Sequence, residues 1–373
     1  MDERFFVNKN VIWINLKNAC KCVKMETNFL NQAKPQNNKR ILTGHRPTGP
    51  RHIGHLVGTI DNWVSLQDSY ECFFLIADLH VLTTDYEHPT QIQQNILEVL
   101  ADWLACGIDP QKSTLILQSA IPAHSQLSLL LSMLVTVSRM SRVPTYKEQV
   151  KELHLQPSLG LLTYPALQTA DILLYKAHAV PVGEDQLPHI ELTREVAHRF
   201  NQVYGDIFPK PEAMLSPHPR LPGIDNRTMH TSYGNAIYMR ETPEETTRKV
   251  MNMYTDPTRI HPTDPGHLEG NPVFAYLDAF DPDQKGVENL KESYRLGKIG
   301  DVAVKRHLAD ILNKALEPIR QVRVDLINRP NDLRYYLHAG TEYARSIAQA
   351  NLKEIQEKMG LIQENHISYS IPQ

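Results

Sequence analysis

The first two thirds of the chain contain short apolar runs that are separated by longer amphipathic stretches. The runs CFFLIADLH and STLILQSA are continuously apolar, which is typical of strands buried on both faces. Between them, TQIQQNILEVLADWLACGI has the period of an amphipathic helix that Gly107 can end. A strand ending near Ile41 and Leu42 and a helix in HIGHLVGTIDNWVSLQDS come before. This strand–helix order predicts an α/β fold with a doubly wound parallel sheet.

The pattern changes further along the chain. HSQLSLLLSMLVTVSRMSRV and TYPALQTADILLY predict helices, followed by a strand at Ala179–Val182, a GEDQ turn and another helix. Beyond about residue 240 only helical patterns occur. We therefore predict an N-terminal extension over residues 1–39, an α/β domain over residues 40–235 and a helical region over residues 236–373.

Composition narrows the class of protein. Hydrophobic residues make up 41% and charged residues 22% of the sequence, as in soluble globular proteins. The formal net charge of -3 argues against an overall basic coat for nucleic acid, although a local basic face is compatible with it. None of the four cysteines forms a CxxC pair, which disfavours a structural zinc or iron–sulfur site. So few cysteines fit a reducing cytosol, and we expect a cytoplasmic protein. No apolar run reaches the ~18 residues of a membrane span, so we expect no membrane association.

The first 39 residues carry no clean signal-peptide pattern. Asp2 and Glu3 argue against a transit peptide. Three interpretations stay open: an amphipathic targeting segment, a weakly structured extension that ends in a polar linker, and a translation start at Met25.

The segment TGHRPTGPRHIGH places glycines and two histidines at a strand–helix turn. Glycines let the backbone approach a phosphate, and the helix that follows offers free N–H groups. His52 and His55 are three residues apart, so both side chains lie on one side of the first helical turn. A P-loop is excluded because its lysine is absent. A plain turn with two surface histidines remains the alternative to nucleotide binding.

Two further segments carry polar residues with open interpretations. In GEDQLPHIELTRE, Asp185 and Gln186 follow the Gly183 turn and can bind ribose hydroxyls and a polar substrate group, or the acidic pair can cap the next helix. In YPALQTADILLY, Asp171 stands within an apolar helix, where a carboxylate needs a partner. It is either part of a core ion pair or a substrate anchor.

In order along the chain, these motifs resemble those of class I aminoacyl-tRNA synthetases. TGHRPTGPRHIGH looks like the HIGH signature region, and TYPALQTADILLYKAHAVPVGEDQLPHIELTREVAHRFN is similar to the amino-acid and ATP-binding stretch of tryptophanyl-tRNA synthetases. RLPGIDNR, TMHTS and YGN together resemble the context of that family's KMSKS loop, and VPTYKEQ and NPVFAYL fit as well. The resemblance runs from about Ile41 to the C-terminus. It implies a Rossmann-like catalytic domain followed by a helical domain that binds the tRNA anticodon.

The resemblance also implies a ligase that activates L-tryptophan with ATP and transfers it to tRNA(Trp). Asp171 would accept the indole N–H, which is a donor only, so a phenylalanine would leave a buried acceptor unpaired. The other residues implied for tryptophan are Tyr164, Gln186, His80 and Gln168. Those implied for ATP are Arg46, Pro47, Thr48, Gly54, His55, Gly183, Glu184, Asp185 and Leu221.

The TMHTS segment takes the place of the KMSKS loop, whose mobile lysines stabilise charge on the phosphates in the family. Its residues Thr228, Met229, His230, Thr231 and Ser232 are implied for ATP. Both lysine positions hold threonine, and losing such a charge contact costs ~3–4 kcal/mol of transition-state stabilisation. The residues implied for catalysis are His52, His55, Arg227, His230 and Ser232.

The family also implies a homodimer, and magnesium carried by ATP without a tight metal site in the protein. Among the C-terminal helices, Lys314, Arg320, Arg323 and Arg329 are candidate phosphate contacts for tRNA, with a solvated helix face as the alternative. The lysine-free loop keeps a second function open, that of a catalytically weakened protein that binds tryptophan or tRNA.

Overall fold

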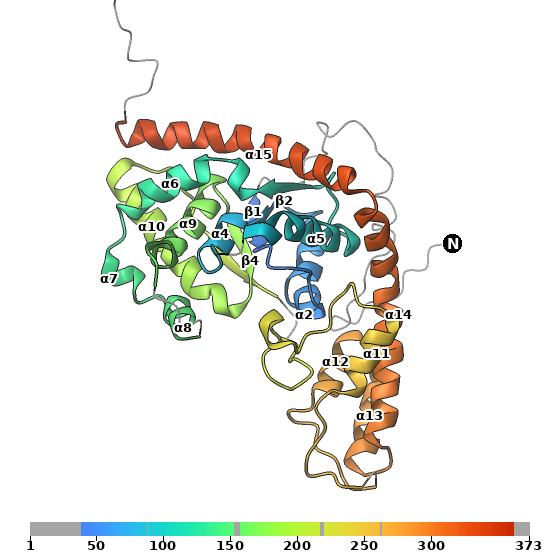
Figure 1. Ribbon diagram of the computed structural model, residues 1–373. Coiled ribbons are helices and arrows are strands. Elements are labelled where there is room, and N and C mark those ends of the chain that lie inside the picture. The colour runs from blue at the N-terminus through green and yellow to red at the C-terminus, as the bar shows by residue number, and fades with distance from the viewer. Residues whose placement is uncertain (1–38, 88, 153–156, 217–219, 262, 362–373) are drawn as a thin grey trace, which may run out of the picture.

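The computed structural model describes residues 39–361 except 88, 153–156, 217–219 and 262. Apart from Lys39, the predicted N-terminal extension lies outside these residues. A sheet of five parallel strands, in the order β3-β2-β1-β4-β5, forms the centre of the larger part of the molecule (Figure 1). The strands are β1 (Arg40–His45), β2 (Glu71–Ile76), β3 (Ser113–Leu117), β4 (Ala179–Val182) and β5 (Glu212–Leu215). The predicted doubly wound parallel sheet is confirmed, and β5 is a strand that the sequence patterns did not predict.

Strand β2 shows why continuous apolar runs form central strands. Cys72, Phe74 and Ile76 contribute to one hydrophobic core cluster, whereas Phe73 and Leu75 contribute to the other. Because successive side chains of a strand point to opposite faces, both faces of β2 are buried and no polar alternation is needed.

Helices cover both faces of the sheet. Those of the α/β part are α2 (Ile53–His55), α3 (Asp61–Leu66), α4 (Asp78–Leu82), α5 (Ile92–Ala105), α6 (Ala123–Ser132), α7 (Val137–Met140), α8 (Pro144–Glu152), α9 (Leu159–Leu174) and α10 (Leu187–Tyr204). A π-helical segment, Leu56–Ile60, joins α2 to α3, so the helix predicted from His52 onward changes its hydrogen-bond pattern after one turn.

Short 3₁₀ segments complete the described chain. They are η3 (Pro89–Gln91), η4 (Gln118–Ala120), η5 (Glu184–Gln186) and η6 (Thr231–Tyr233). Two sequence predictions were too long. Strand β2 ends at Ile76, with His80 in helix α4, and the single helix predicted over HSQLSLLLSMLVTVSRMSRV is divided into α6 and α7. In both places the apolar pattern continues past the residue at which the strand or helix ends.

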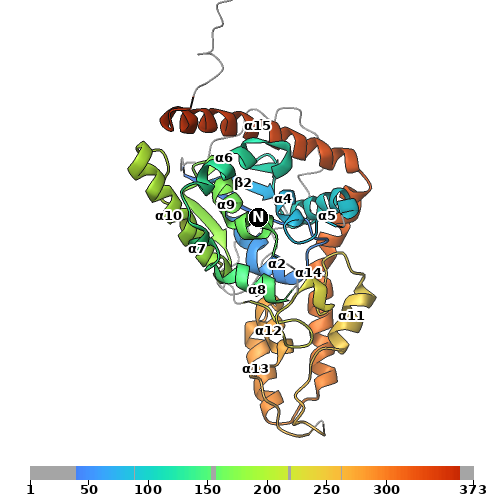
Figure 2. The ribbon, with the colours of Figure 1, turned by 60° about the vertical axis from the view of Figure 1, so that its left-hand side comes forward.

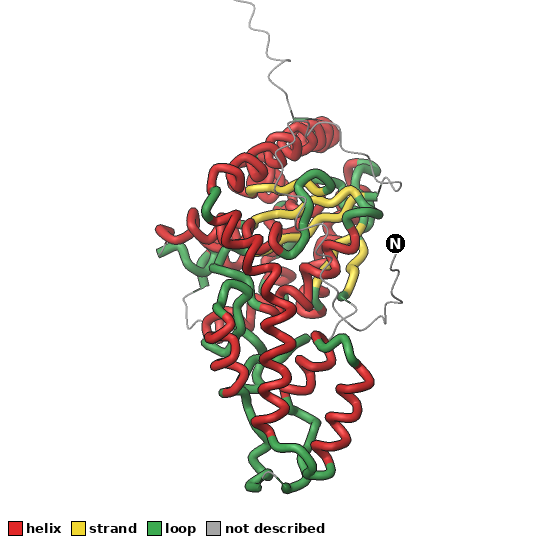
Figure 3. The backbone as a smooth tube through the Cα atoms, turned by 90° about the vertical axis from the view of Figure 1, so that its right-hand side faces the viewer, coloured by secondary structure: helices red, strands yellow, loops and turns green. Residues whose placement is uncertain are grey.

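The C-terminal part is helical, as predicted. It comprises α11 (Pro243–Met251), α12 (Pro272–Phe280), α13 (Gln284–Arg295), α14 (Asp301–Ile327) and α15 (Pro330–Lys358). Figure 3 shows the sheet towards one end of the molecule and only helices and loops at the other. Helix α14 runs from the helical end back to the sheet (Figure 1).

Helix α15 returns to the α/β part and lies along β3 and α6 (Figure 2). Ala344, Ala348 and Leu352 belong to the same core cluster as Phe73. Gly340 permits the close approach, since a Cβ atom there would lie 2.3 Å from the carbonyl oxygen of Leu115. The predicted division at residue 235 stays a prediction, and it did not foresee that the last helix packs on the sheet.

Candidate active site

The turn between β1 and α2 carries the two HIGH-type histidines. His52 precedes α2 and His55 ends it, and their ring centroids are 3.8 Å apart. The sequence prediction that both lie on one side is confirmed. The Nδ1 atom of His52 is buried without a hydrogen-bond partner among the described residues. Such an atom requires a ligand or water to satisfy it.

Both imidazoles are neutral near pH 7. Burial, followed by the charges of Arg51 and His230, lowers the pKa of His52 to about 3. Burial and the same neighbours hold the pKa of His55 well below its ordinary value. These histidines can therefore hydrogen-bond phosphate oxygens but do not supply positive charge.

Arg51 supplies a positive charge next to this turn, and the sequence analysis did not predict it as a site residue. Its Nη2 donates to the carbonyl oxygen of Gly49 at 2.6 Å, and its Nη1 lies 3.5 Å from Nε2 of His55. Burial lowers the pKa of Arg51 to about 10, which leaves the guanidinium charged at neutral pH. No motif distinguishes this arginine in the sequence; only its burial reveals its position.

The turn is fixed from α5 and α14. Oδ2 of Asp102 accepts the backbone N–H of Arg51 at 2.6 Å, and Oδ1 accepts Nε of Arg323 at 2.6 Å. Asp102 is fully buried. Burial raises the pKa of Asp102, opposed by Arg323 and by the hydrogen bond from Arg51. The ionised carboxylate thus depends on Arg323.

The predicted tRNA contacts therefore need a correction. Arg323 and Arg320 are only 8% exposed. Arg323 also binds Glu98, and Nη2 of Arg320 donates to Thr246 at 2.8 Å. Both arginines face inward because α14 packs against α5 and α11. Arg329 pairs with Asp332 at 3.0 Å, whereas Lys314 is exposed.

The segment around TMHTS docks on the HIGH-type turn. The N–H of Ile53 donates to the carbonyl oxygen of Ile237 at 2.9 Å, and the N–H of Met239 donates to that of Arg51 at 3.2 Å. A Cβ atom on Gly54 would lie 3.0 Å from Sδ of the buried Met229. The two segments that the resemblance implies for ATP are therefore in contact, and their role in ATP binding stays a prediction.

Asn235 shapes the loop from inside. Its Oδ1 accepts the N–H of His230 at 2.9 Å, while its Nδ2 donates to Oδ1 of Asp225 at 2.8 Å and to the carbonyl oxygen of Thr228 at 3.0 Å. Nε of Arg227 donates to Oδ2 of Asp225 at 2.7 Å. The charge of Arg227 is thus partly neutralised within the loop, which weakens it as a substitute for lysine.

The exposed part of the loop presents Thr228 and His230 to solvent. Thr231 is half-buried, and Ser232 lies in η6, with its side chain outside the described set. Among the described residues 223–235, Arg227 is the sole arginine and no lysine occurs. The loop therefore lies next to the HIGH-type turn and has Arg227 but no lysine among its described residues.

The remaining ATP-site residues fall on both sides of the turn. Arg46 reaches Thr84, and its buried Nε has no hydrogen-bond partner within the described chain. Pro47 is buried, Thr48 is exposed, and Leu221 is buried in the core cluster beside Met229. Together with Nδ1 of His52, Nε of Arg46 gives the predicted ATP site two polar atoms that a ligand can satisfy.

A hydrogen-bonded chain joins the predicted ribose and tryptophan sides. Asp185 accepts Nη2 of Arg220 at 2.9 Å and Nε2 of Gln186 at 2.8 Å, and Gln186 accepts Nε2 of Gln168 at 3.3 Å. Glu184 is exposed. Gly183 leaves room for this arrangement, since its Cβ would lie 2.7 Å from Oδ1 of Asp185.

Asp171 is the most enclosed polar residue of the predicted tryptophan site. Nε2 of His80 lies 2.8 Å from Oδ2, and Nδ1 of His124 lies 2.6 Å from Oδ1. Nε2 of Gln118 donates to both oxygens, at 2.9 and 2.8 Å. Burial alone would raise the pKa of Asp171, but these histidines outweigh it and hold the pKa well below its ordinary range. The carboxylate is therefore ionised.

The sequence left two roles open for Asp171, and the structure shows a core polar cluster at the predicted pocket. His124 and Gln118 were missed because both stand in ordinary surroundings, in QSAIPAH. Tyr164 lies near His80, with ring centroids 6.4 Å apart, and its hydroxyl is 2.6 Å from Oγ1 of Thr145. The five residues predicted for tryptophan therefore fall into three hydrogen-bonded groups: His80 with Asp171, Tyr164 with Thr145, and Gln168 with Gln186.

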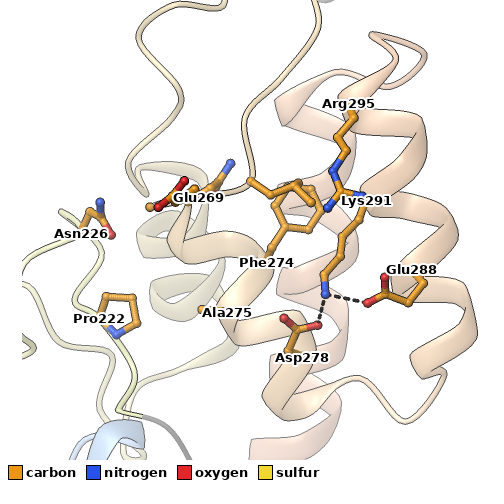
Figure 4. A pocket seen from close by; sticks show the side chains of 12 residues that line it. Pro222, Asn226, Glu269, Phe274, Ala275, Asp278, Glu288, Lys291 and Arg295 are labelled. Atoms are coloured by element: carbon orange, nitrogen blue, oxygen red, sulfur yellow. Dashed lines mark hydrogen bonds and ion pairs between the residues drawn. The ribbon is translucent and has the colours of Figure 1, made fainter.

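A cavity of about 390 Å³ lies elsewhere, beside α12 and α13 (Figure 4). It touches Pro222 and Asn226, which lie just before the TMHTS segment. Lys291 points toward Asp278 and Glu288 and binds them at 2.6 and 2.7 Å. Arg295 lines the same cavity, which none of the residues predicted for ATP or tryptophan lines.

Within the described ranges, no group of three or more His, Cys, Asp or Glu residues is placed to hold a metal ion. None of the described helices is both long and apolar enough to cross a membrane.

The fold agrees with the comparisons with known proteins. The model of the class I tRNA synthetases (W and Y) matches residues 34–317, so the chain belongs to this family. It is similar to the tryptophan–tRNA ligase of Chlamydia caviae, with 47% identity over 331 residues that cover 87% of this chain and 96% of the relative. The tryptophan–tRNA ligase of Treponema pallidum is 47% identical over 326 residues, 86% of this chain and 97% of the relative.

A solved structure agrees with the family. The tryptophanyl-tRNA synthetase from Campylobacter jejuni, complexed with ADP and tryptophan, has a TM-score of 0.78 at 33% identity and covers 86% of this chain and 100% of that chain. The predicted family and fold class are confirmed.

Proposed function

We propose that this protein is a tryptophan–tRNA ligase, which activates L-tryptophan with ATP and transfers it to tRNA(Trp). One observation carries the proposal beyond family membership: Asp171 is an ionised carboxylate enclosed in the pocket that the sequence assigns to the amino acid. A buried acceptor of this kind selects the one common side chain that combines a large apolar body with an N–H donor.

The first step forms tryptophanyl-adenylate. The tryptophan carboxylate attacks the α-phosphorus of ATP, and diphosphate leaves. The protein contributes position and electrostatic stabilisation. His52, His55 and Arg46 would face the nucleotide, with Arg51 as a positive charge beneath the turn. Magnesium would enter as part of the ATP substrate.

The opposite end of the nucleotide meets Gly183, Glu184 and Asp185 in this proposal. The contacts through Gln186 and Gln168 then link the ribose side to the amino-acid side. Leu221 and Met229 would border the adenine and the phosphates. Thr228, His230, Thr231 and Ser232 would face the departing diphosphate.

The decisive experiment is tryptophan-dependent exchange of diphosphate into ATP, at saturating ATP and magnesium. The proposal expects exchange with tryptophan and none with phenylalanine or tyrosine. Absence of exchange above background for all three amino acids would overturn it.

The alternative from the sequence, a protein that binds tryptophan or tRNA but activates tryptophan poorly, is not favoured by the tryptophan–tRNA ligases that this chain resembles. Calorimetry separates the candidates. Tight tryptophan binding without exchange supports the binding protein, whereas turnover excludes it.

The protein would act as a homodimer in the cytoplasm. Leu129 in α6, Met133 just after α6 and Val137 at the start of α7 are exposed by 62%, 67% and 71%. Such a set fits a covered surface. Light scattering on the Met133→Glu variant tests it: a lighter particle than the unaltered protein is expected, and an unchanged mass at all concentrations argues against this surface.

A further inference from the structure

We infer that His124, held by Tyr175, and Gln118 are positioning residues that keep the Asp171 carboxylate in place for the indole N–H, and so set the discrimination between tryptophan and analogues that lack this donor. The inference rests on the proposed function and adds three residues to its amino-acid site.

The hydrogen bonds that the Asp171 carboxylate already accepts leave no free position for a further donor. Its two oxygens offer about four lone-pair directions. Gln118 donates to both oxygens, His124 to Oδ1 and His80 to Oδ2. In this structure all four directions are therefore used, and an indole N–H needs one donor to give way.

Burial indicates which donor gives way. Gln118 and His124 are both 0% exposed, whereas His80 is 7% exposed. His80 also lies beside Tyr164, the ring predicted to border the substrate. His80 is thus on the ligand side of the carboxylate, and His124 and Gln118 hold it from the interior.

Tyr175 determines how His124 binds. Nδ1 of His124 faces a carboxylate that can only accept, so Nδ1 carries the hydrogen. Nε2 of His124 lies 2.9 Å from the hydroxyl of Tyr175, which can donate to this nitrogen or accept from it. The Tyr175 ring is itself fixed, fully buried and stacked on Phe73 with centroids 5.0 Å apart.

The order of support follows from this chain of contacts. Phe73 holds the Tyr175 ring, Tyr175 orients His124, and His124 and Gln118 orient Asp171. A carboxylate supported by His80 alone would lose its support when the ligand displaced that ring. With interior support it stays in place and ionised, as an acceptor for an N–H requires.

The test measures diphosphate exchange with tryptophan and with β-(3-benzothienyl)alanine, in which sulfur replaces the indole N–H. For His124→Leu, kcat/KM with tryptophan should fall ~10–100-fold, the value of a hydrogen bond to a charged group, while the analogue changes little. The ratio between the two substrates should fall accordingly. Tyr175→Phe keeps the ring and should reduce the ratio in the same direction by less.

Two further variants separate positioning from general damage. His124→Asn retains a donor near the Nδ1 position and should recover most of the lost discrimination. Phe200→Leu alters a fully buried ring of the same core cluster that packs against the rings of Tyr204 and Phe208, and should leave the ratio unchanged.

Each outcome decides one question. Exchange in the unaltered protein with an unchanged substrate ratio in both His124→Leu and Tyr175→Phe overturns the inference alone. Equal losses for tryptophan and the analogue in both variants, without recovery in His124→Asn, also overturn it, because they show general damage. An unaltered protein without tryptophan-dependent exchange overturns the proposed function instead.

Discussion

The amino-acid side and the phosphate side of the candidate site are built in opposite ways. Around Asp171, three buried side chains saturate one carboxylate. Around TMHTS, exposed side chains lie on a loop whose arginine is bound by Asp225. The difference indicates that the groups predicted to select the amino acid are buried in the core, whereas the groups predicted to face the phosphates lie mainly on the exposed side of a loop that only Met229 anchors in the core.

The amino-acid side should suffer the largest loss from one substitution. Asp171→Leu removes the acceptor and leaves the buried donors of His80, His124 and Gln118 unpaired, so kcat/KM for tryptophan should fall by ~10³-fold or more. Exchange kinetics measure it. Asp68→Leu alters an exposed aspartate and is the control; a loss below tenfold for Asp171→Leu would show that the carboxylate does not select the indole.

On the phosphate side, restored charge should raise the rate. Thr228→Lys with Thr231→Lys places two cations where the family has them, and kcat for adenylate formation should rise by up to ~10²–10³-fold. Single-turnover kinetics measure it, with Gln93→Lys and Gln111→Lys as an exposed charge control. If the loop pair raises kcat no more than the control pair does, the missing lysines do not limit the reaction.

Removing the contact through which Arg323 on α14 supports the HIGH-type turn should have a moderate effect on the KM for ATP. Arg323→Met leaves Asp102 without its cation, and burial then favours the neutral acid, which binds the N–H of Arg51 more weakly. The KM for ATP should rise ~3–10-fold, the difference between a charged and a neutral hydrogen bond, with little change in the KM for tryptophan.

Arg320→Met is the matched control for this variant. Arg320 has the same 8% exposure on the same helix, but it binds Thr246 and Asn313 instead of a carboxylate on α5. Arg323→Lys keeps the positive charge and should recover part of the ATP effect. Equal KM values for ATP in Arg323→Met and Arg320→Met would refute the link.

The smallest expected effect is on the way in which the free energy of unfolding depends on pH. Because the folded pKa of His52 is about 3, below its ordinary 6.5, the unfolded chain binds more protons between these values. The contribution of His52 to the free energy of unfolding is complete above pH 6.5 and is lost as the pH falls toward 3. His45 and His55 act in the same direction, whereas the lowered pKa of Asp171 acts only below its ordinary 3.8.

The thermal midpoint should therefore fall between pH 7 and pH 5, through His52, His45 and His55 on the phosphate side and also through His189 beside Tyr164, whose pKa burial lowers to about 4. One pKa unit corresponds to ~1.4 kcal/mol and roughly 2–4 °C. His52→Asn should flatten the slope, and His261→Asn, at an exposed position, should not. Parallel slopes for all three proteins would contradict the lowered pKa of His52.

The sequence by itself determined much of the fold because its strongest signals are local. Continuous apolar runs predicted β2 and β3, and the Gly- and Pro-rich turn before His52 predicted the start of α2. Strand β5 was missed because EAML is short and only partly buried. The packing of α15 against the α/β part was not predicted, because an amphipathic pattern shows that one face of a helix is buried but not against which surface.

The same division holds for the site. The amino-acid sequence alone showed the order of the motifs, the acidic residue inside an apolar helix and the absence of lysine from TMHTS. Only the tertiary structure decided that His124, Gln118 and Tyr175 surround Asp171, that Arg51 lies beneath the HIGH-type turn, and that Asp225 binds Arg227. For the Asp171 cluster the physical reason is distance along the chain, because hydrogen bonds between residues some fifty positions apart, as between His124 and Tyr175, leave no periodic trace in a sequence. Asp225 and Arg227 are only two positions apart, but whether such neighbours pair depends on side-chain directions that the folded loop sets.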